Sequence, residues 1–202
     1  MTNRAEAIID LSAIRANVAL LKARAGVDLM AVVKADAYGH GLVPVAKAAL
    51  EGGANWLGVA LLEEAITLRK AGVTAPILAW LVPPGSDFKS AVYSDIDIAV
   101  SSIKALEEVG AVAGSKRPRV HLEVDTGMTR GGFLSEWNQI DAHHVQGVEI
   151  IGIFSHFARA DEPGQPQNLE QLARFKEMVA TLESFGYTKI IRHLSNSAAT
   201  LL

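Results

Sequence analysis

The chain has 202 residues, of which 50% are hydrophobic and 20% charged, with a net charge of -3 and no cysteine. That length allows one domain with a substantial core, while the acidic balance argues against nucleic acid or an anionic membrane as partner, and the lack of cysteine excludes a disulfide framework. Because residues 1–6 do not resemble a signal peptide and no apolar run reaches the roughly 20 residues of a membrane span, we expect a cytoplasmic protein without a membrane partner.

In the first half of the chain, short apolar runs alternate with helical patterns. A first helix is predicted from Ser12, whose hydroxyl can cap it, to Gly26, which can end it. Pro44 suits the first turn of a second helix. The predicted strands of this half are residues 29–33, 56–60 and 76–80, and the predicted helices after them are residues 44–52, 62–71 and 88–93.

The second half of the chain repeats this alternation. A helix is predicted after Ser101 or Ser102, either of which can cap it, and another begins at the very end, with Ser195 or Ser197 as its cap. The predicted strands of this half are residues 97–100, 119–124, 148–154 and 189–194, and its longest predicted helix is residues 169–185.

Strict alternation of strands and helices, with strands apolar on both faces, indicates an α/β protein with a parallel sheet covered by helices. Seven such units suit a (β/α)8 TIM-type barrel that lacks its eighth strand. No linker divides the chain, so residues 1–202 are expected to form one incomplete barrel domain. The apolar end, residues 198–202, resembles the first turn of a helix, and we therefore expect the chain to be a fragment of a longer protein.

Functional side chains of a parallel barrel lie where the strands end and the following loops begin. A lysine, a tyrosine, an arginine, a histidine, an amide and a hydroxyl all follow predicted strands. This combination suits a phosphorylated ligand that carries a carbonyl group. The residues are Lys34, Tyr38, Arg130, His156, Asn196 and Ser197.

Lys34 is the strongest candidate among them. It directly follows the apolar pair Val32 and Val33, and desolvation at a strand end favours the neutral, nucleophilic amine. The alternative is a lysine at the barrel rim whose ammonium group simply reaches solvent.

Two other motifs do not indicate a cofactor-binding loop or a metal site. Gly39-His40-Gly41 fails as a dinucleotide-binding loop because Pro44 occupies the position of the third glycine, and His40 is predicted to be a turn residue. His143 and His144 are adjacent on a predicted helix and cannot face one metal together. No metal site is expected.

Four segments of the chain resemble those of the alanine racemase family. Residues 31–41, AVVKADAYGHG, resemble the cofactor-lysine signature of that family almost letter for letter. Residues 125–130, 155–163 and 196–199 resemble three further segments, and all four occur in the family's order. The resemblance covers essentially the whole chain.

The resemblance implies pyridoxal 5'-phosphate (PLP) as cofactor. Lys34 would form a Schiff base with PLP and then act as acid or base on one face of the substrate α-carbon. Arg130 would face the phenolic oxygen of PLP and the substrate carboxylate. The other implied contacts are the phosphate with Tyr38 and Ser197, Asn196 beside them, and His156 against the pyridine ring.

Two departures from the family matter. Glu123 stands where well-known members carry a lysine, and we expect its carboxylate to support Arg130. The opposite-face tyrosine, the arginine on the pyridine nitrogen and the C-terminal β domain, contributed across a homodimer, would lie beyond residue 202. We therefore expect the fragment alone to be inactive.

By resemblance, the longer protein would interconvert L-alanine and D-alanine and so supply D-alanine for peptidoglycan. The alternatives that stay open are a broad-specificity amino-acid racemase, a lyase similar to D-threonine aldolase, and a non-catalytic PLP-binding barrel.

Overall fold

The computed structural model describes residues 5–112, 114–141 and 143–202. Seven strands form one parallel sheet in which each strand pairs with the next along the chain. This order is that of a (β/α) barrel, as predicted. The strands are β1 (Met30–Val32), β2 (Trp56–Val59), β3 (Ile77–Ala79), β4 (Asp97–Val100), β5 (Arg119–Glu123), β6 (Glu149–Phe154) and β7 (Ile191–His193).

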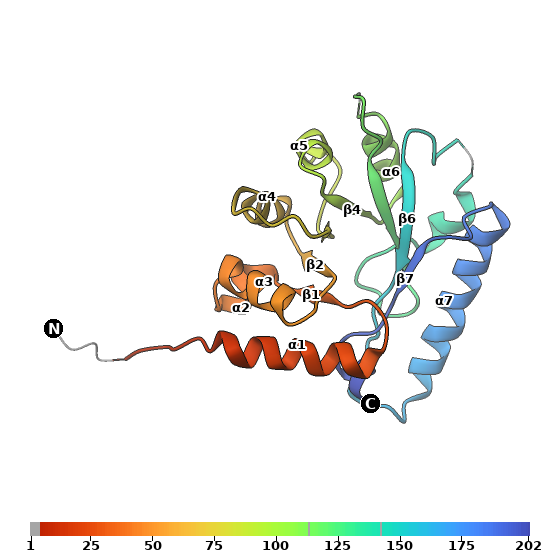
Figure 1. Cartoon of the computed structure of the whole chain (residues 1–202). Coiled ribbons are helices and arrows are strands. Elements are labelled where there is room, and N and C mark those ends of the chain that lie inside the picture. The colour runs from red at the N-terminus through yellow and green to blue at the C-terminus, as the bar shows by residue number, and fades with distance from the viewer. Residues whose placement is uncertain (1–4, 113, 142) are drawn as a thin grey trace.

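Helices surround the curled sheet (Figure 1). One helix precedes β1, and a helical segment follows each strand. The segments after β1, β2, β4 and β7 begin within four residues of the strand end, whereas longer loops separate β3, β5 and β6 from α5, η1 and α7. The helices are α1 (Leu11–Ala25), α2 (Lys34–Gly39), α3 (Leu42–Glu51), α4 (Leu62–Lys70), α5 (Phe88–Tyr93), α6 (Ile103–Gly110), the 3-10 helix η1 (Ser135–Gln139), α7 (Pro166–Ser184) and α8 (Ser197–Leu201).

Alternate residues of each strand point to opposite faces of the sheet, and both faces are packed. The outer face packs against the helices through fully buried residues such as Leu57, Ile98 and Leu122. The inner face holds a second cluster that includes Leu78 and Phe154. Residues on the inner face therefore point into the barrel, and those at the strand ends reach its rim.

The sheet has two edges, β1 and β7, because no eighth strand lies among the described residues. The helices on the outside nevertheless meet: α1 packs against α8, and the guanidinium of Arg24 donates to the carbonyl of Leu201 at 3.4 Å. The prediction of seven βα units is thus confirmed. No helix in the described ranges is both long and apolar enough to cross a membrane.

Two predicted helix caps are wrong. The cap of α1 is Asp10, whose Oδ1 accepts the N–H groups of Ser12 and Ala13, because a carboxylate at this position reaches both donors. The cap of α8 is Asn196 rather than a serine, and its Oδ1 accepts the N–H of Ala199. Of the two serines predicted as alternative caps of α6, Ser102 is the cap, and Gly26 ends α1 as predicted.

Two further local predictions differ from the structure. His143 and His144 lie in a turn rather than a helix, since Asp141 Oδ1 accepts both of their N–H groups. The long helix α7 begins at Pro166, three residues before the predicted start, because proline is accommodated at the first position of a helix.

Candidate active site

Three predicted site residues are in register with strand residues whose side chains point into the barrel. Lys34 lies two residues after Val32 in β1, and Glu123 is the last residue of β5. His156 lies two residues after Phe154, which belongs to the inner cluster. Since strand residues two apart share a face, all three side chains belong to the rim of the barrel at the carboxyl ends of the strands.

The short segment α2 is not an ordinary right-handed helix, because the residues directly after Lys34 form a left-handed turn. Residues 35–38 all have φ between 52° and 57°, although none of them is a glycine. Backbone bonds from Ala37 N–H to the carbonyl of Val33 and from Gly41 N–H to that of Asp36 close the turn. Asp36 Oδ1 also accepts the N–H of Leu42 at 2.6 Å, which fixes the start of α3. His40 ends this turn and caps it, as a turn residue was predicted to do.

Two aromatic rings lie near the amine of Lys34. Its Nζ is 5.7 Å from the ring centroid of Trp80, which follows β3, and 5.9 Å from that of Tyr38. The Lys34 side chain is half-buried rather than fully desolvated, and Tyr38 is 60% exposed. The amine is therefore held among aromatic groups and remains accessible from the rim.

Glu123, Arg130 and His156 line a small depression. Its lining also includes Asp125, Met128 and Ser155. Burial raises the pKa of the Glu123 carboxyl, and the positive charge of Arg130 partly offsets this shift. Burial also lowers the pKa of His156, and the positive charges of Arg130 and Lys34 lower it further. The imidazole is thus neutral near pH 7, beside a carboxylate, a guanidinium and an amine.

A buried network that sequence reasoning missed holds the two loops of this cluster together. Gln171 of α7 is fully buried, donates to Thr126 Oγ1 at 3.2 Å and to the carbonyl of His156 at 2.9 Å, and accepts the N–H of Ala158. Thr126 and Ser155 share a hydroxyl hydrogen bond of 2.8 Å. The available signal was the place of Gln171 on the apolar stripe of α7 with Phe175 and Val179.

The remaining two predicted residues lie after β7. The Asn196 side chain is used as the cap of α8, so its oxygen already has a backbone donor. Ser197 is exposed and is the first residue of that helix. Both belong to the same rim because β7 pairs with β6, but neither lines the depression between Glu123 and His156.

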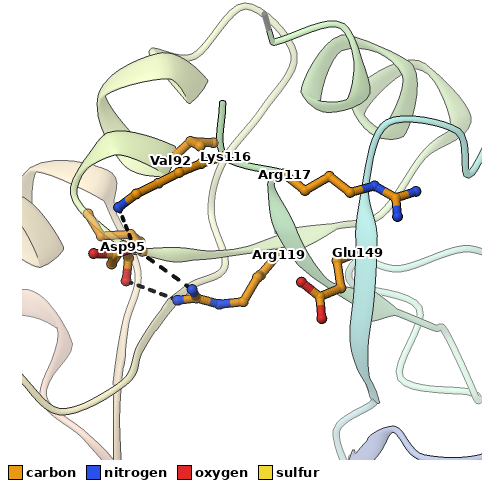
Figure 2. Close-up of a pocket in the computed structure, with 7 residues that line it drawn as sticks. Val92, Asp95, Lys116, Arg117, Arg119 and Glu149 are labelled. Carbon is orange, nitrogen blue, oxygen red and sulfur yellow. Dashed lines mark hydrogen bonds and ion pairs between the residues drawn. The ribbon is translucent and has the colours of Figure 1, made fainter. Parts of the chain in front are cut away.

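A cavity of about 250 Å³ lies at the opposite end of the strands (Figure 2). Arg119 and Glu149 begin β5 and β6, and Asp95 precedes β4. Figure 2 shows Lys116 and Arg119 both directed at Asp95. Most of the charged side chains that line this cavity are therefore paired with one another. This cavity is remote from Lys34. The described residues also hold no group of three or more potential metal ligands.

The fold defines a class: a parallel (β/α) barrel, with a lysine directly after its first strand. The chain belongs to the alanine racemase family, since the family model "Alanine racemase, N-terminal domain" matches residues 9–202.

Individual relatives agree with this assignment. The alanine racemase of Salinispora tropica is 50% identical over 98% of this chain and 55% of its own length. The crystal structure of alanine racemase from Streptomyces lavendulae superposes with a TM-score of 0.91 at 46% identity, covering 96% of this chain and 53% of that one. The alanine racemase from Bacillus anthracis with bound L-Ala-P has a TM-score of 0.84 at 37% identity, covering 96% and 52%. The chain thus spans about half the length of the relatives that it matches.

Proposed function

We propose that the chain is the PLP-binding barrel part of an alanine racemase and that Lys34 is its cofactor lysine. The observation that carries this proposal is the accessible Lys34 amine, on the same rim as the neutral His156 and the cationic Arg130. Family membership supplies the reaction, the interconversion of L-alanine and D-alanine. A role in supplying D-alanine for peptidoglycan, a homodimer and a cytoplasmic location rest on that membership alone.

The residues of the rim fit PLP in their chemistry. The amine of Lys34 can bond to an aldehyde, and the half-buried neutral ring of His156 can lie against an aromatic ring. The guanidinium of Arg130 suits anionic oxygens, and the hydroxyl groups of Tyr38 and Ser197 suit a phosphate. When bound, PLP withdraws electrons from the α-carbon of an amino acid and makes its proton acidic.

Each residue then has a proposed task. Lys34 would hold the cofactor through its amine and would remove or return the proton on one face of the substrate α-carbon. Arg130 binds the substrate carboxylate. Glu123, next to Arg130, supports the guanidinium with an unmodified carboxylate, although burial raises the pKa of that carboxyl. Asn196 contributes mainly through the start of α8, where its side chain fixes the backbone next to Ser197.

Racemisation needs a second acid–base group on the opposite face of the substrate. The chain covers only 55% of the Salinispora tropica enzyme, and we propose that the other group lies in the uncovered part. The 202 residues alone are then expected to exchange the α-proton of alanine slowly at most, without efficient inversion.

A PLP titration of wild type, Lys34→Ala and the control Lys47→Ala tests the proposal. Lys47 is exposed on α3 and measures the background reaction of PLP with surface lysines. We expect saturable binding with a visible absorption band in wild type and Lys47→Ala, and its loss in Lys34→Ala. Equal binding by all three proteins would refute Lys34 as the cofactor lysine. With PLP and D- or L-alanine in deuterated water, Lys34-dependent α-proton exchange would separate an enzyme part from a non-catalytic PLP-binding barrel.

A further inference from the structure

The carboxylate of Glu64 joins the turn after β1 to the turn after β2. Its Oε1 accepts a hydrogen bond from the backbone N–H of Ala35 at 2.5 Å. Its Oε2 accepts the N–H groups of Ala60 and Leu61, each at 2.9 Å. One half-buried side chain thus satisfies three backbone donors at two neighbouring strand ends, and each bond is strengthened by the charge of the acceptor.

Only part of this pattern is explained by helix capping. Glu64 is the third residue of α4, a position from which a glutamate commonly accepts the N–H of the cap residue, here Leu61. The bond to Ala35 has no such explanation, because Ala35 lies 29 residues earlier and follows a different strand.

Ala35 is the first residue of the left-handed turn. L-residues rarely adopt this conformation, and four in succession persist only where their surroundings hold them. Glu64 supplies such a restraint at the start of the turn, and Asp36 supplies another at its end through Leu42. The residue before the turn is Lys34, and the last residue within it is Tyr38, whose ring lies 5.9 Å from the Lys34 amine.

We propose that Glu64 is a positioning residue: it holds the left-handed turn so that Lys34 and Tyr38 face the same ligand. Residues four apart lie on one side of a helical turn of either hand, because a turn takes about 3.6 residues. The hand of the turn decides in which direction Tyr38 lies from Lys34. The consequence for cofactor binding rests on the proposed function, whereas the restraint on the turn does not.

The substitution Glu64→Gln separates the capping role from the positioning role. Glutamine has one acceptor oxygen, which can keep the bonds to Ala60 and Leu61 while its amide group faces the N–H of Ala35. We expect about tenfold faster hydrogen exchange at Ala35 and about tenfold weaker PLP binding, the effect of losing one hydrogen bond to a charged acceptor, while the protein stays folded and loses no more stability than that one bond provides. The matched control is Glu63→Gln, an exposed neighbour whose side chain has no hydrogen bond among the described residues.

Hydrogen exchange resolved at Ala35 and PLP titration are measured on the same samples. Faster exchange and weaker binding in Glu64→Gln, with neither in Glu63→Gln, support the proposal. Normal exchange at Ala35 in Glu64→Gln overturns it, and so does faster exchange with unchanged PLP affinity. If wild type itself fails to bind PLP, the proposed function fails, while the exchange rates still decide whether Glu64 restrains the turn.

Discussion

Backbone strain at the residue scale can be measured at Ala35. This alanine is exposed and has φ of 52°, a conformation that costs an L-residue about 1 kcal/mol or more relative to glycine. We expect Ala35→Gly to raise the free energy of unfolding by about 1 kcal/mol. The matched control is Ala19→Gly, at an exposed position of the right-handed helix α1, which should lower it by about 1 kcal/mol. Destabilisation of equal size by both substitutions, in urea denaturation, would show that the turn is not left-handed.

Gly152 makes room inside the barrel for the fully buried His121, which pairs with the half-buried His193. His121 Nδ1 and His193 Nε2 share a hydrogen bond of 2.9 Å, and the ring of His193 stacks on Phe154. A Cβ added at Gly152 would lie 2.2 Å from His121 Nδ1. We expect Gly152→Ala to destabilise the fold by about 3 kcal/mol through overpacking and loss of that bond. Gly164→Ala, where a Cβ meets nothing within 4 Å, is the control, and equal unfolding midpoints for the two variants would contradict the packing described.

Asp97 gives the stability of the fold a distinctive pH dependence. Burial raises the pKa of its carboxyl to about 6, despite the hydrogen bond from Arg119, and its Oδ2 has no hydrogen-bond partner among the described residues. A carboxyl with a raised pKa in the folded state favours folding while protonated, and this contribution is lost as pH rises from about 4 through 6. Relative to Asp97→Asn, wild type should therefore lose about 2 kcal/mol of unfolding free energy between pH 4 and pH 7. A pH-independent difference between the two proteins, measured by denaturation at each pH, would exclude the raised pKa.

At the scale of elements, α7 anchors the two loops that carry Arg130 and His156. Gln171→Leu preserves volume but leaves the N–H of Ala158 and the carbonyl of His156 without their partner. We expect a loss of about 2 kcal/mol of stability and faster hydrogen exchange in both loops. Glu170→Gln, on the exposed side of the same helix, should change neither. If hydrogen exchange in Gln171→Leu became faster only within α7, the structure of the two loops would not depend on Gln171.

The elements differ in how far the sequence predicts them. Strands such as β4 and helices such as α5 are predicted to the residue, because hydrophobic pattern and flanking turn residues agree. Residues 35–38 could not be predicted as left-handed, since alanine and tyrosine have no local preference for that conformation. The hand of this turn is fixed by contacts from elsewhere, above all Glu64 and Asp36.

The residues of the candidate site also differ in how far the sequence predicts them. Lys34, Glu123 and His156 follow from strand ends, because a parallel barrel brings all such ends to one rim. Glu64 and Gln171 could not be found in this way, since their bonds join residues 29 and 13–45 positions apart in the sequence. The cap role of Asn196 was also missed, because three adjacent polar residues compete for that position.

At the scale of the whole molecule, the seven-stranded sheet of the described residues has two unpaired edge strands. Val32 and Ile191, on the edge strands β1 and β7, are each 40% exposed. The contact between α1 and α8 joins the two ends of the helical layer outside these strands. The role proposed for Lys34 can be tested in this chain, although the chain spans about half the length of its relatives.

The most direct test is to locate the lysine that PLP modifies. The chain is incubated with PLP, reduced with borohydride, digested and mapped by mass spectrometry, with Lys47 as the internal reference for exposed lysines. We expect pyridoxyl phosphate to be fixed predominantly on Lys34, and we expect Lys34→Ala to abolish this label without an increase at other lysines. Modification spread evenly over exposed lysines, with Lys34 no more reactive than Lys47, would contradict a cofactor site at the end of β1.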